Sequence, residues 1–84
     1  MSVPVTIYTM SNCSYCERAK ALLKQRGVAF TEIHVDLNDE PQWRALHART
    51  GLRTMPQIFS GDSVIGGYSD LAALDSKDGL VSLK

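Results

Sequence analysis

The first half of the chain shows apolar and polar residues in short runs that predict a strand, a helix and a second strand. Val3–Thr9 is rich in β-branched residues and ends before the turn-forming pair Ser11-Asn12, which indicates a strand. Tyr15–Arg26 carries alanine and leucine at helical spacing with basic residues between them, and Gly27 supplies a C-terminal stop. Phe30–Val35 alternates again, so we expect a second strand there.

The second half predicts a helix followed by a hairpin. Glu40-Pro41 fits a helix start with proline in the first turn, and we expect this helix to stop at Gly51. Gln57–Ser60 and Ser63–Ile65 have the character of two short strands. The pair between them, Gly61-Asp62, is typical of a two-residue hairpin turn.

The last elements complete the expected fold class. Ser69 is expected to cap a final helix, Asp70–Asp75, and the tail Leu80–Leu83 to pack on the domain. A βαβ unit gives two parallel strands with a right-handed crossover, and the hairpin then adds antiparallel. The sequence therefore predicts an α/β protein with a four-stranded mixed sheet flanked by three helices, as one domain over residues 1–84.

The charge and composition of the chain limit the kinds of partner that we expect. The 84 residues have a formal net charge of zero, so nothing suggests a nucleic-acid footprint or a membrane-surface patch. The apolar stretches are too short to span a bilayer, and no signal peptide is visible at the N-terminus. One cysteine pair without an export signal favours a reducing compartment, and we expect a cytoplasmic protein.

Both cysteines of the chain lie in one motif, Cys13-Ser14-Tyr15-Cys16, between the first expected strand and the first expected helix. A cysteine at a helix N-terminus faces backbone N–H groups and the helix dipole, which favour the thiolate over the thiol. A thiolate with a second thiol one turn away can attack a disulfide and then release itself. The motif therefore indicates thiol–disulfide exchange.

Two other roles for the cysteine pair stay open. As a structural disulfide, the pair would close a very short loop and give a chain-entropy gain of only roughly 2 kcal/mol. As a zinc site, it is half of a four-ligand set, and His34 and His47 do not stand in a finger-like spacing with it. The sequence therefore predicts no metal ligands.

Three motifs in order resemble the glutaredoxin family over nearly the whole chain. The first is Ile7-Tyr8-Thr9 with the cysteine motif, the second is 53–59 (Arg-Thr-Met-Pro-Gln-Ile-Phe), and the third is 65–71 (Ile-Gly-Gly-Tyr-Ser-Asp-Leu). The match is nearest to the short bacterial dithiol kind. The resemblance implies a thioredoxin-like fold with sheet order 2-1-3-4 and a cis bond before Pro56, which leaves the N–H and C=O of Met55 free for an extended substrate.

The resemblance also implies the function. It makes Cys13 the nucleophile and Cys16 the resolving thiol of a glutathione-dependent oxidoreductase that reduces glutathionylated proteins and protein disulfides. Glutathione is then a co-substrate, and the protein is expected to be a monomer. The residues implied in glutathione binding are Tyr15, Arg53, Thr54, Met55, Pro56, Gly67, Tyr68, Ser69 and Asp70. Free N–H groups at a helix start suit a carboxylate, and Asp70 suits an ammonium group.

The chain departs from the family pattern at four positions. Ser14 stands where proline is commoner, and Met10 stands where many members carry a lysine beside the thiol. Trp43 falls where a polar residue often meets glutathione, and we expect it to be a packing residue. Tyr68 replaces a common third cysteine. Basic residues that could take the place of the missing lysine are Arg18, Lys20 and Arg53. Arg44 or Arg53 could meet glutathione in place of the residue at position 43.

Other functions stay open at this point. A redoxin reduced by thioredoxin reductase has a similar size but typically lacks the Gly-Gly-x-x-Asp segment found here. Some glutaredoxins with serine at the position of Ser14 carry a [2Fe–2S] cluster between two subunits, so a glutathione-ligated dimer is a further alternative. Locally, 54–56 could be only a loop, and 66–70 could be only an ordinary capped helix start.

Overall fold

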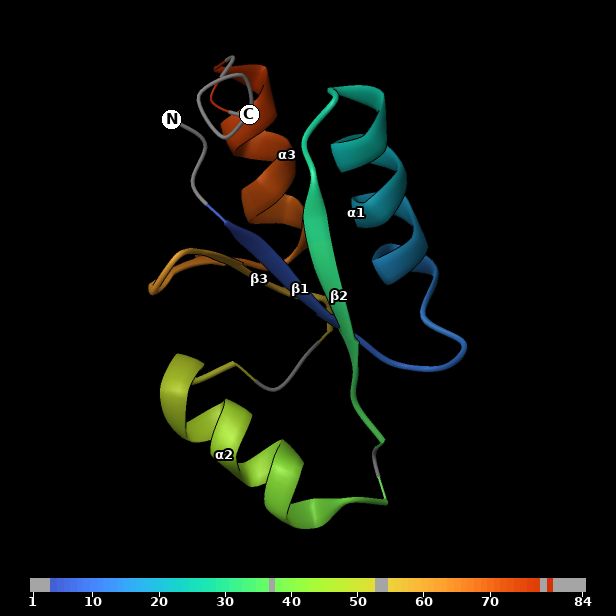
Figure 1. Cartoon of the computed structure of the whole chain (residues 1–84), viewed down its shortest axis with the longest axis vertical. Helices are drawn as coiled ribbons and strands as arrows, with labels where there is room; N and C mark the ends of the chain where they lie inside the picture. The colour runs from blue at the N-terminus through green and yellow to red at the C-terminus, as the bar shows by residue number, and fades with distance from the viewer. Residues whose placement is uncertain (1–3, 37, 53–54, 78, 80–84) are drawn as a thin grey trace.

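The computed structural model describes residues 4–36, 38–52, 55–77 and 79. Arg53, Thr54 and the tail Leu80–Leu83 lie outside these residues. Figure 1 shows the chain order of strands and helices. The elements are β1 (Val5–Thr9), α1 (Ser14–Gln25), β2 (Phe30–His34), α2 (Glu40–Thr50), β3 (Gln57–Ser60), β4 (Ser63–Gly66) and α3 (Tyr68–Ser76).

The four strands form one mixed sheet in the order β2-β1-β3-β4, which confirms the predicted fold class. Strands β1 and β2 are parallel, with Val5 opposite Phe30. Strand β3 runs antiparallel to β1, with Ile58 opposite Ile7, and β4 runs antiparallel to β3. Strand β1 lies between β2 and β3, and its carboxyl end leads into the loop that ends at Cys13, the N-cap of α1.

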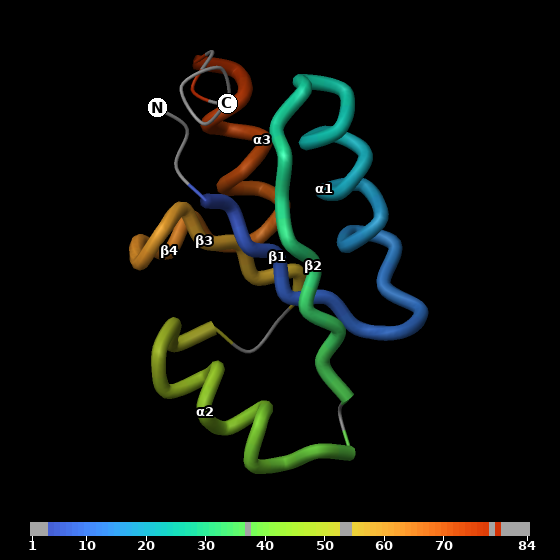
Figure 2. Tube along the Cα trace, viewed as in Figure 1, coloured from blue at the N-terminus to red at the C-terminus, as the bar shows by residue number. Residues whose placement is uncertain are grey.

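The helices cover both faces of the sheet. Helices α1 and α3 lie side by side on one face, and α2 lies on the other (Figures 1 and 2). Each face has its own buried cluster. We call the first the α1/α3 core, formed by Val5, Ile7, Ala19, Leu23, Val28, Ile58 and Leu71. The second is the α2 core, formed by Cys16, Val35, Leu46, Met55 and Phe59.

The ends of the first two helices follow their local sequence. Helix α1 begins one residue before the predicted Tyr15, because Cys13 takes the N-cap position. Gly27 has a φ of 73°, and its N–H donates to the carbonyl of Lys24, which ends α1 as expected. Helix α2 ends at Gly51, where φ is 72° and the N–H donates to the carbonyl of His47.

The start of α3 corrects the sequence prediction. Ser69 is not the cap: the helix begins at Tyr68, and Gly67 is the N-cap. The reason lies in Asp70, whose carboxylate accepts a hydrogen bond from the backbone N–H of Gly67 at 3.0 Å. This carboxylate supplies the N-terminal contact that we expected from the serine hydroxyl, so the first turn forms two residues earlier.

The strand bounds differ slightly from the prediction. Strand β1 begins at Val5, whereas the predicted start, Val3, lies outside the described residues. Strand β2 ends at His34, although the N–H of Val35 still donates to the carbonyl of Thr9 at 2.7 Å. Strand β4 reaches Gly66, one residue beyond the predicted Ile65. The hairpin turn at 61–62 is confirmed, since β3 and β4 pair across it.

Candidate active site

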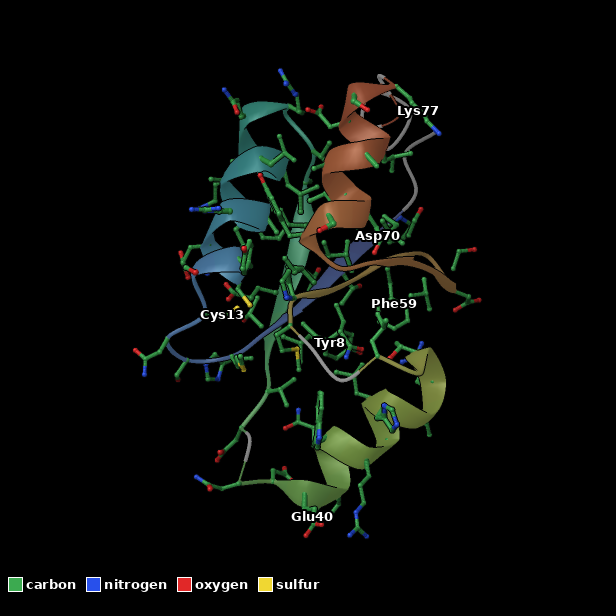
Figure 3. All side chains as sticks on the ribbon, turned by 180° about the vertical axis from the view of Figure 1, so that it is seen from behind. Tyr8, Cys13, Glu40, Phe59, Asp70 and Lys77 are labelled. Carbon is green, nitrogen blue, oxygen red and sulfur yellow. The ribbon has the colours of Figure 1, made fainter. Side chains whose placement is uncertain are left out.

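Cys13 caps helix α1 with its own sulfur. The residue has extended backbone angles, and its Sγ accepts a hydrogen bond from the N–H of Cys16 at 3.2 Å. Asn12 precedes it with a φ of 58°, which turns the chain from β1 into the helix. An N–H donor and the positive end of the helix dipole both face this sulfur, an arrangement that stabilises negative charge on it. Figure 3 shows Cys13 at this end of α1.

Cys16 lies one turn further along α1 and is completely buried. Desolvation by burial, followed by a side-chain hydrogen bond with Cys13, raises the pKa of Cys16 from 9.0 to about 12. Both cysteines are free thiols, and only Cys13 is partly exposed. The structure therefore separates an accessible sulfur from an inaccessible one that stays protonated at neutral pH.

Alkylation should distinguish the two thiols. In a Cys13→Ser variant, Cys16 should resist iodoacetamide up to about pH 9, where an ordinary thiol is half ionised, because its raised pKa keeps it protonated and its burial excludes the reagent. In a Cys16→Ser variant, Cys13 should be modified readily. Mass spectrometry measures both, and the denatured Cys13→Ser variant provides the positive control. Rapid labelling of Cys16 in the native variant would contradict the assignment.

The segment before β3 brings a backbone carbonyl close to the sulfur of Cys13. The Met55–Pro56 bond is cis, as the sequence predicted. The carbonyl oxygen of Met55 lies 3.7 Å from Cys13 Sγ, within the range of a weak S–H hydrogen bond. This carbonyl is therefore not entirely free, in contrast to the expectation from the sequence. The contact ties the loop before β3 to the N-terminus of α1.

Gln57, the residue after this loop, holds the loop in place from inside the protein. Its side chain is completely buried. The amide Nε2 donates to the carbonyl of Leu52 at 3.1 Å, and Oε1 accepts from the hydroxyl of Thr50 at 2.8 Å. The same hydroxyl accepts from the N–H of Leu52 at 3.0 Å. Gln57 thus fastens the end of α2 to the start of β3 and brackets the segment that carries Met55. The sequence analysis missed this role.

Replacing Gln57 with leucine should destabilise the protein by about 1–3 kcal/mol, because the carbonyl of Leu52 and the hydroxyl of Thr50 would lose buried partners. Urea unfolding of the reduced protein measures this change in free energy. The matched control is Gln25→Leu at the exposed end of α1, which should change stability by less than about 0.5 kcal/mol. Equal stability of Gln57→Leu and the wild type would show that the network does not hold the loop.

A pocket of about 240 Å³ opens beside this loop. Tyr15, Met55, Pro56, Tyr68 and Ser69 line it, and all five were implied in glutathione binding by the family resemblance. The rings of Tyr15 and Tyr68 lie 5.8 Å apart between centroids and span the pocket from α1 to α3. Arg53 and Thr54 were also implied in glutathione binding, and both lie outside the described residues.

The turn into α3 forms the far side of the pocket. Gly66 has a φ of 123°, and a Cβ atom there would collide with the carboxylate of Asp70. Gly67 follows, and its carbonyl accepts the first helical bond, from Leu71. The three N–H groups that precede Leu71 have no partner within a helix of this geometry. They stand beside the exposed carboxylate of Asp70, which Figure 3 labels at this end of α3.

Lys20 does not substitute for the lysine that the family carries beside the thiol. Its Nζ lies 2.9 Å from Glu17 and 3.0 Å from Glu32, so two carboxylates share its charge. Hydrogen bonds to Glu17 and then Glu32 raise the pKa of Lys20. The hydroxyl of Thr9 also donates to Glu32 at 2.7 Å, and this bond, followed by that from Lys20, lowers the pKa of Glu32. The network joins α1 to β1 and β2.

Met10 and Trp43 are packing residues in this structure. Both are partly buried and rest against the α2 core. The indole of Trp43 stacks on the ring of His47, with centroids 6.4 Å apart and planes 28° apart. This arrangement agrees with the expectation that Trp43 is a packing residue. The Nδ1 of His47 in turn lies 3.0 Å from the carbonyl of Leu52.

Among the residues that the structure describes, there is no cluster of three or more histidine, cysteine or acidic side chains that could bind a metal ion. Within the same residues, no helix combines the length and apolar character needed to cross a bilayer.

A family model described as glutaredoxin matches residues 5–65. The chain belongs to the glutaredoxin family. Glutaredoxin 3 of Escherichia coli (strain K12) is 47% identical to it over 76 residues, which cover 90% of each chain. Members of this family are thiol–disulfide oxidoreductases that use glutathione, and the two thiols described above have the corresponding arrangement.

Solved glutaredoxins share the fold. A crystal structure of a buckwheat glutaredoxin–glutathione complex superimposes with a TM-score of 0.86 at 29% identity, covering 96% of this chain and 76% of that one. The solution structure of glutaredoxin from Brucella melitensis gives a TM-score of 0.80 at 41% identity, covering 98% of this chain and 91% of that one. The chain therefore shares its fold with solved glutaredoxins, and one of these, the buckwheat protein, was crystallised with glutathione.

Proposed function

We propose that this glutaredoxin reduces glutathionylated proteins and protein disulfides with glutathione as electron donor, and that Cys13 is the nucleophile and Cys16 the resolving thiol. The observation that carries the proposal is the inequality of the two sulfurs. Cys13 is partly exposed at a helix N-terminus, whereas Cys16 is buried with its pKa raised to about 12. Only the first can meet a substrate disulfide.

Glutathionylated substrates need Cys13 alone. Its thiolate attacks the glutathione sulfur of the mixed disulfide, so a Cys13–glutathione disulfide forms and the substrate leaves as a thiolate that takes up a proton. A second glutathione thiolate then attacks the bound glutathione sulfur. Glutathione disulfide leaves, and the Cys13 thiolate is restored.

Protein disulfides need both thiols. Cys13 attacks one sulfur of the substrate and forms a mixed disulfide, while the other substrate sulfur leaves. Cys16 then attacks the sulfur of Cys13, the substrate leaves reduced, and a Cys13–Cys16 disulfide remains. Because Cys16 is protonated before this step, its proton passes to the departing substrate thiolate. Two glutathione molecules reduce the enzyme disulfide and leave as glutathione disulfide.

The pocket beside Cys13 is the proposed place for glutathione. Its γ-glutamyl end carries a carboxylate and an ammonium group on one carbon. The free N–H groups at the start of α3 suit the carboxylate, since a helix N-terminus attracts negative charge. Asp70 suits the ammonium group, with one carboxylate oxygen held by the N–H of Gly67. A relative of the same fold, from buckwheat, forms a complex with glutathione, which supports glutathione as the ligand.

The two cysteine variants should separate the two reactions. Cys13→Ser should abolish both, because no accessible thiolate remains to begin either. Cys16→Ser should still reduce a glutathionylated peptide but should lose reduction of a protein disulfide, since the mixed disulfide has no resolving thiol. Both rates are followed through formation of glutathione disulfide. Activity that survives in Cys13→Ser would overturn the assignment of the nucleophile.

Two substitutions at Asp70 should separate its binding role from its structural role. Asp70→Asn keeps an oxygen for the N–H of Gly67 but loses the charge, so it should raise the Michaelis constant for glutathione roughly five- to tenfold with little change in melting temperature. Asp70→Ala loses both contributions and should also lower the melting temperature. Asp62→Asn, in the exposed hairpin turn, is the control and should change neither quantity.

An unchanged Michaelis constant in Asp70→Asn, together with a lower melting temperature in Asp70→Ala, would mean that Asp70 only stabilises the start of α3. The glutathione site would then have to lie elsewhere.

Two simple measurements on the purified protein distinguish this function from the alternatives. Reduction that proceeds with thioredoxin reductase and without glutathione would favour the redoxin alternative. Visible absorption and a dimer on purification would favour a [2Fe–2S] carrier, for which Ser14, exposed directly after Cys13, is the sequence feature. We place the proposed activity in a monomer in the cytoplasm, where a cysteine pair stays reduced.

A further inference from the structure

A cation and two aromatic rings form a row across the mouth of the active-site pocket. The guanidinium carbon of Arg18 lies 5.3 Å from the ring centroid of Tyr15, in cation–π geometry. Tyr15 is 53% exposed, so its ring is accessible to a bound chain. Its ring leans toward Tyr68 at a centroid distance of 5.8 Å. The row therefore runs from the outer surface of α1 to the start of α3.

Among the described residues of the first two turns of α1, Arg18 is a cation without an ion-pair partner. The neighbouring cation, Lys20, is shared by Glu17 and Glu32. Arg26, at the other end of α1, pairs with Asp75 at 2.8 Å. Within the described part of the chain, Arg18 makes no ion pair, although it is exposed two residues after Cys16. Its contact with the Tyr15 ring limits its freedom, so less side-chain entropy is lost when it binds an anion.

We propose that Arg18 and Tyr15 form a docking surface for polypeptide substrates that carry an acidic side chain within one or two residues of the target cysteine. This proposal rests on the proposed function and names its substrate class. The Tyr15 ring offers apolar contact to the chain that enters beside the pocket, and Arg18 offers the charge that a carboxylate needs. An extended chain advances about 3.3 Å per residue, so a side chain next to the cysteine stays near the pocket mouth.

Glutathione is the other source of carboxylates at this site, and the start of α3 and Asp70 already suit its γ-glutamyl end. Arg18 stands on the α1 side of the pocket, across the two rings from that position. The geometry therefore assigns Arg18 to the polypeptide and leaves glutathione to α3. A role for Arg18 with the glycine carboxylate of glutathione is an outcome that the experiment distinguishes.

The test uses two glutathionylated peptides that differ only in the residue next to the single cysteine, glutamate in one and lysine in the other. The full chain at low ionic strength should have a higher kcat/KM for the glutamate peptide, by about two- to fivefold, as expected for one exposed charge pair. Arg18→Glu should reverse this preference. Added salt should reduce the preference in both proteins, because it screens exposed charges.

Lys24→Glu is the matched control. It makes the same change of charge on the same helix, but Lys24 lies in the last turn of α1, away from the cysteines. This variant should keep the wild-type preference for the glutamate peptide. A reversal in Lys24→Glu equal to that in Arg18→Glu would overturn the proposal, because the effect would then reflect net charge alone.

The remaining outcomes are also decisive. An equal preference in the wild type and Arg18→Glu, with normal turnover of both peptides, would overturn the docking surface and leave the proposed function intact. A higher Michaelis constant for glutathione in Arg18→Glu, with the peptide preference unchanged, would assign Arg18 to glutathione and overturn the proposal as well. Failure of the wild type to reduce either peptide, or a small uncharged mixed disulfide, would overturn the proposed function itself.

Discussion

One hydrogen bond, from the backbone N–H of Cys16 to the sulfur of Cys13, joins the fold of this glutaredoxin to its chemistry. A helix start needs a side-chain acceptor for its free N–H groups, a role that serine, threonine, asparagine and aspartate usually take. Here a sulfur takes it, at 3.2 Å. The atom that caps α1 is therefore also the atom that attacks the disulfide in the proposed reaction. Its position relative to the second thiol is set by helix geometry and not by a flexible loop.

The packing of the sheet makes two chemically identical residues unequal. Cys16 belongs to the α2 core, together with Val35 and Leu46, so the contacts that hold α2 on the sheet also exclude water from its sulfur. Burial disfavours the charged form of a thiol, which is why the same contacts raise the pKa of Cys16. Cys13 stands one helical turn closer to the surface, so it only packs against the edge of this core and stays partly exposed. The order in which the two thiols act in the proposed reaction therefore follows from the difference in their burial.

The pattern of apolar and turn-forming residues was sufficient to predict the four strands, the three helices and the position of the cysteine motif after β1. The strand order and the cis bond before Pro56 came from the resemblance to the family. These patterns were not sufficient where a side chain forms a hydrogen bond that its local sequence does not indicate. A serine before an acidic residue is typical of a cap, but Asp70 reaches back to Gly67 and displaces Ser69 from that role. Gln57 gave no signal beyond a polar residue in an apolar strand, because its importance comes from Thr50 and Leu52 across a loop. The roles of such side chains depend on their contacts in the folded protein, and local sequence patterns do not show those contacts.

The charge balance of the whole chain hides a strong local asymmetry at the pocket. The formal net charge is zero, so the protein as a whole exerts no long-range attraction on an anion. Yet α1 and α3 both point their N-termini at the pocket, as the positions of Cys13 and Asp70 show (Figure 3). Two positive dipole ends therefore converge at the pocket, where they favour negative charge. Asp70 adds a single negative charge at the edge of this region, and the result is a site that matches a zwitterion better than a simple anion.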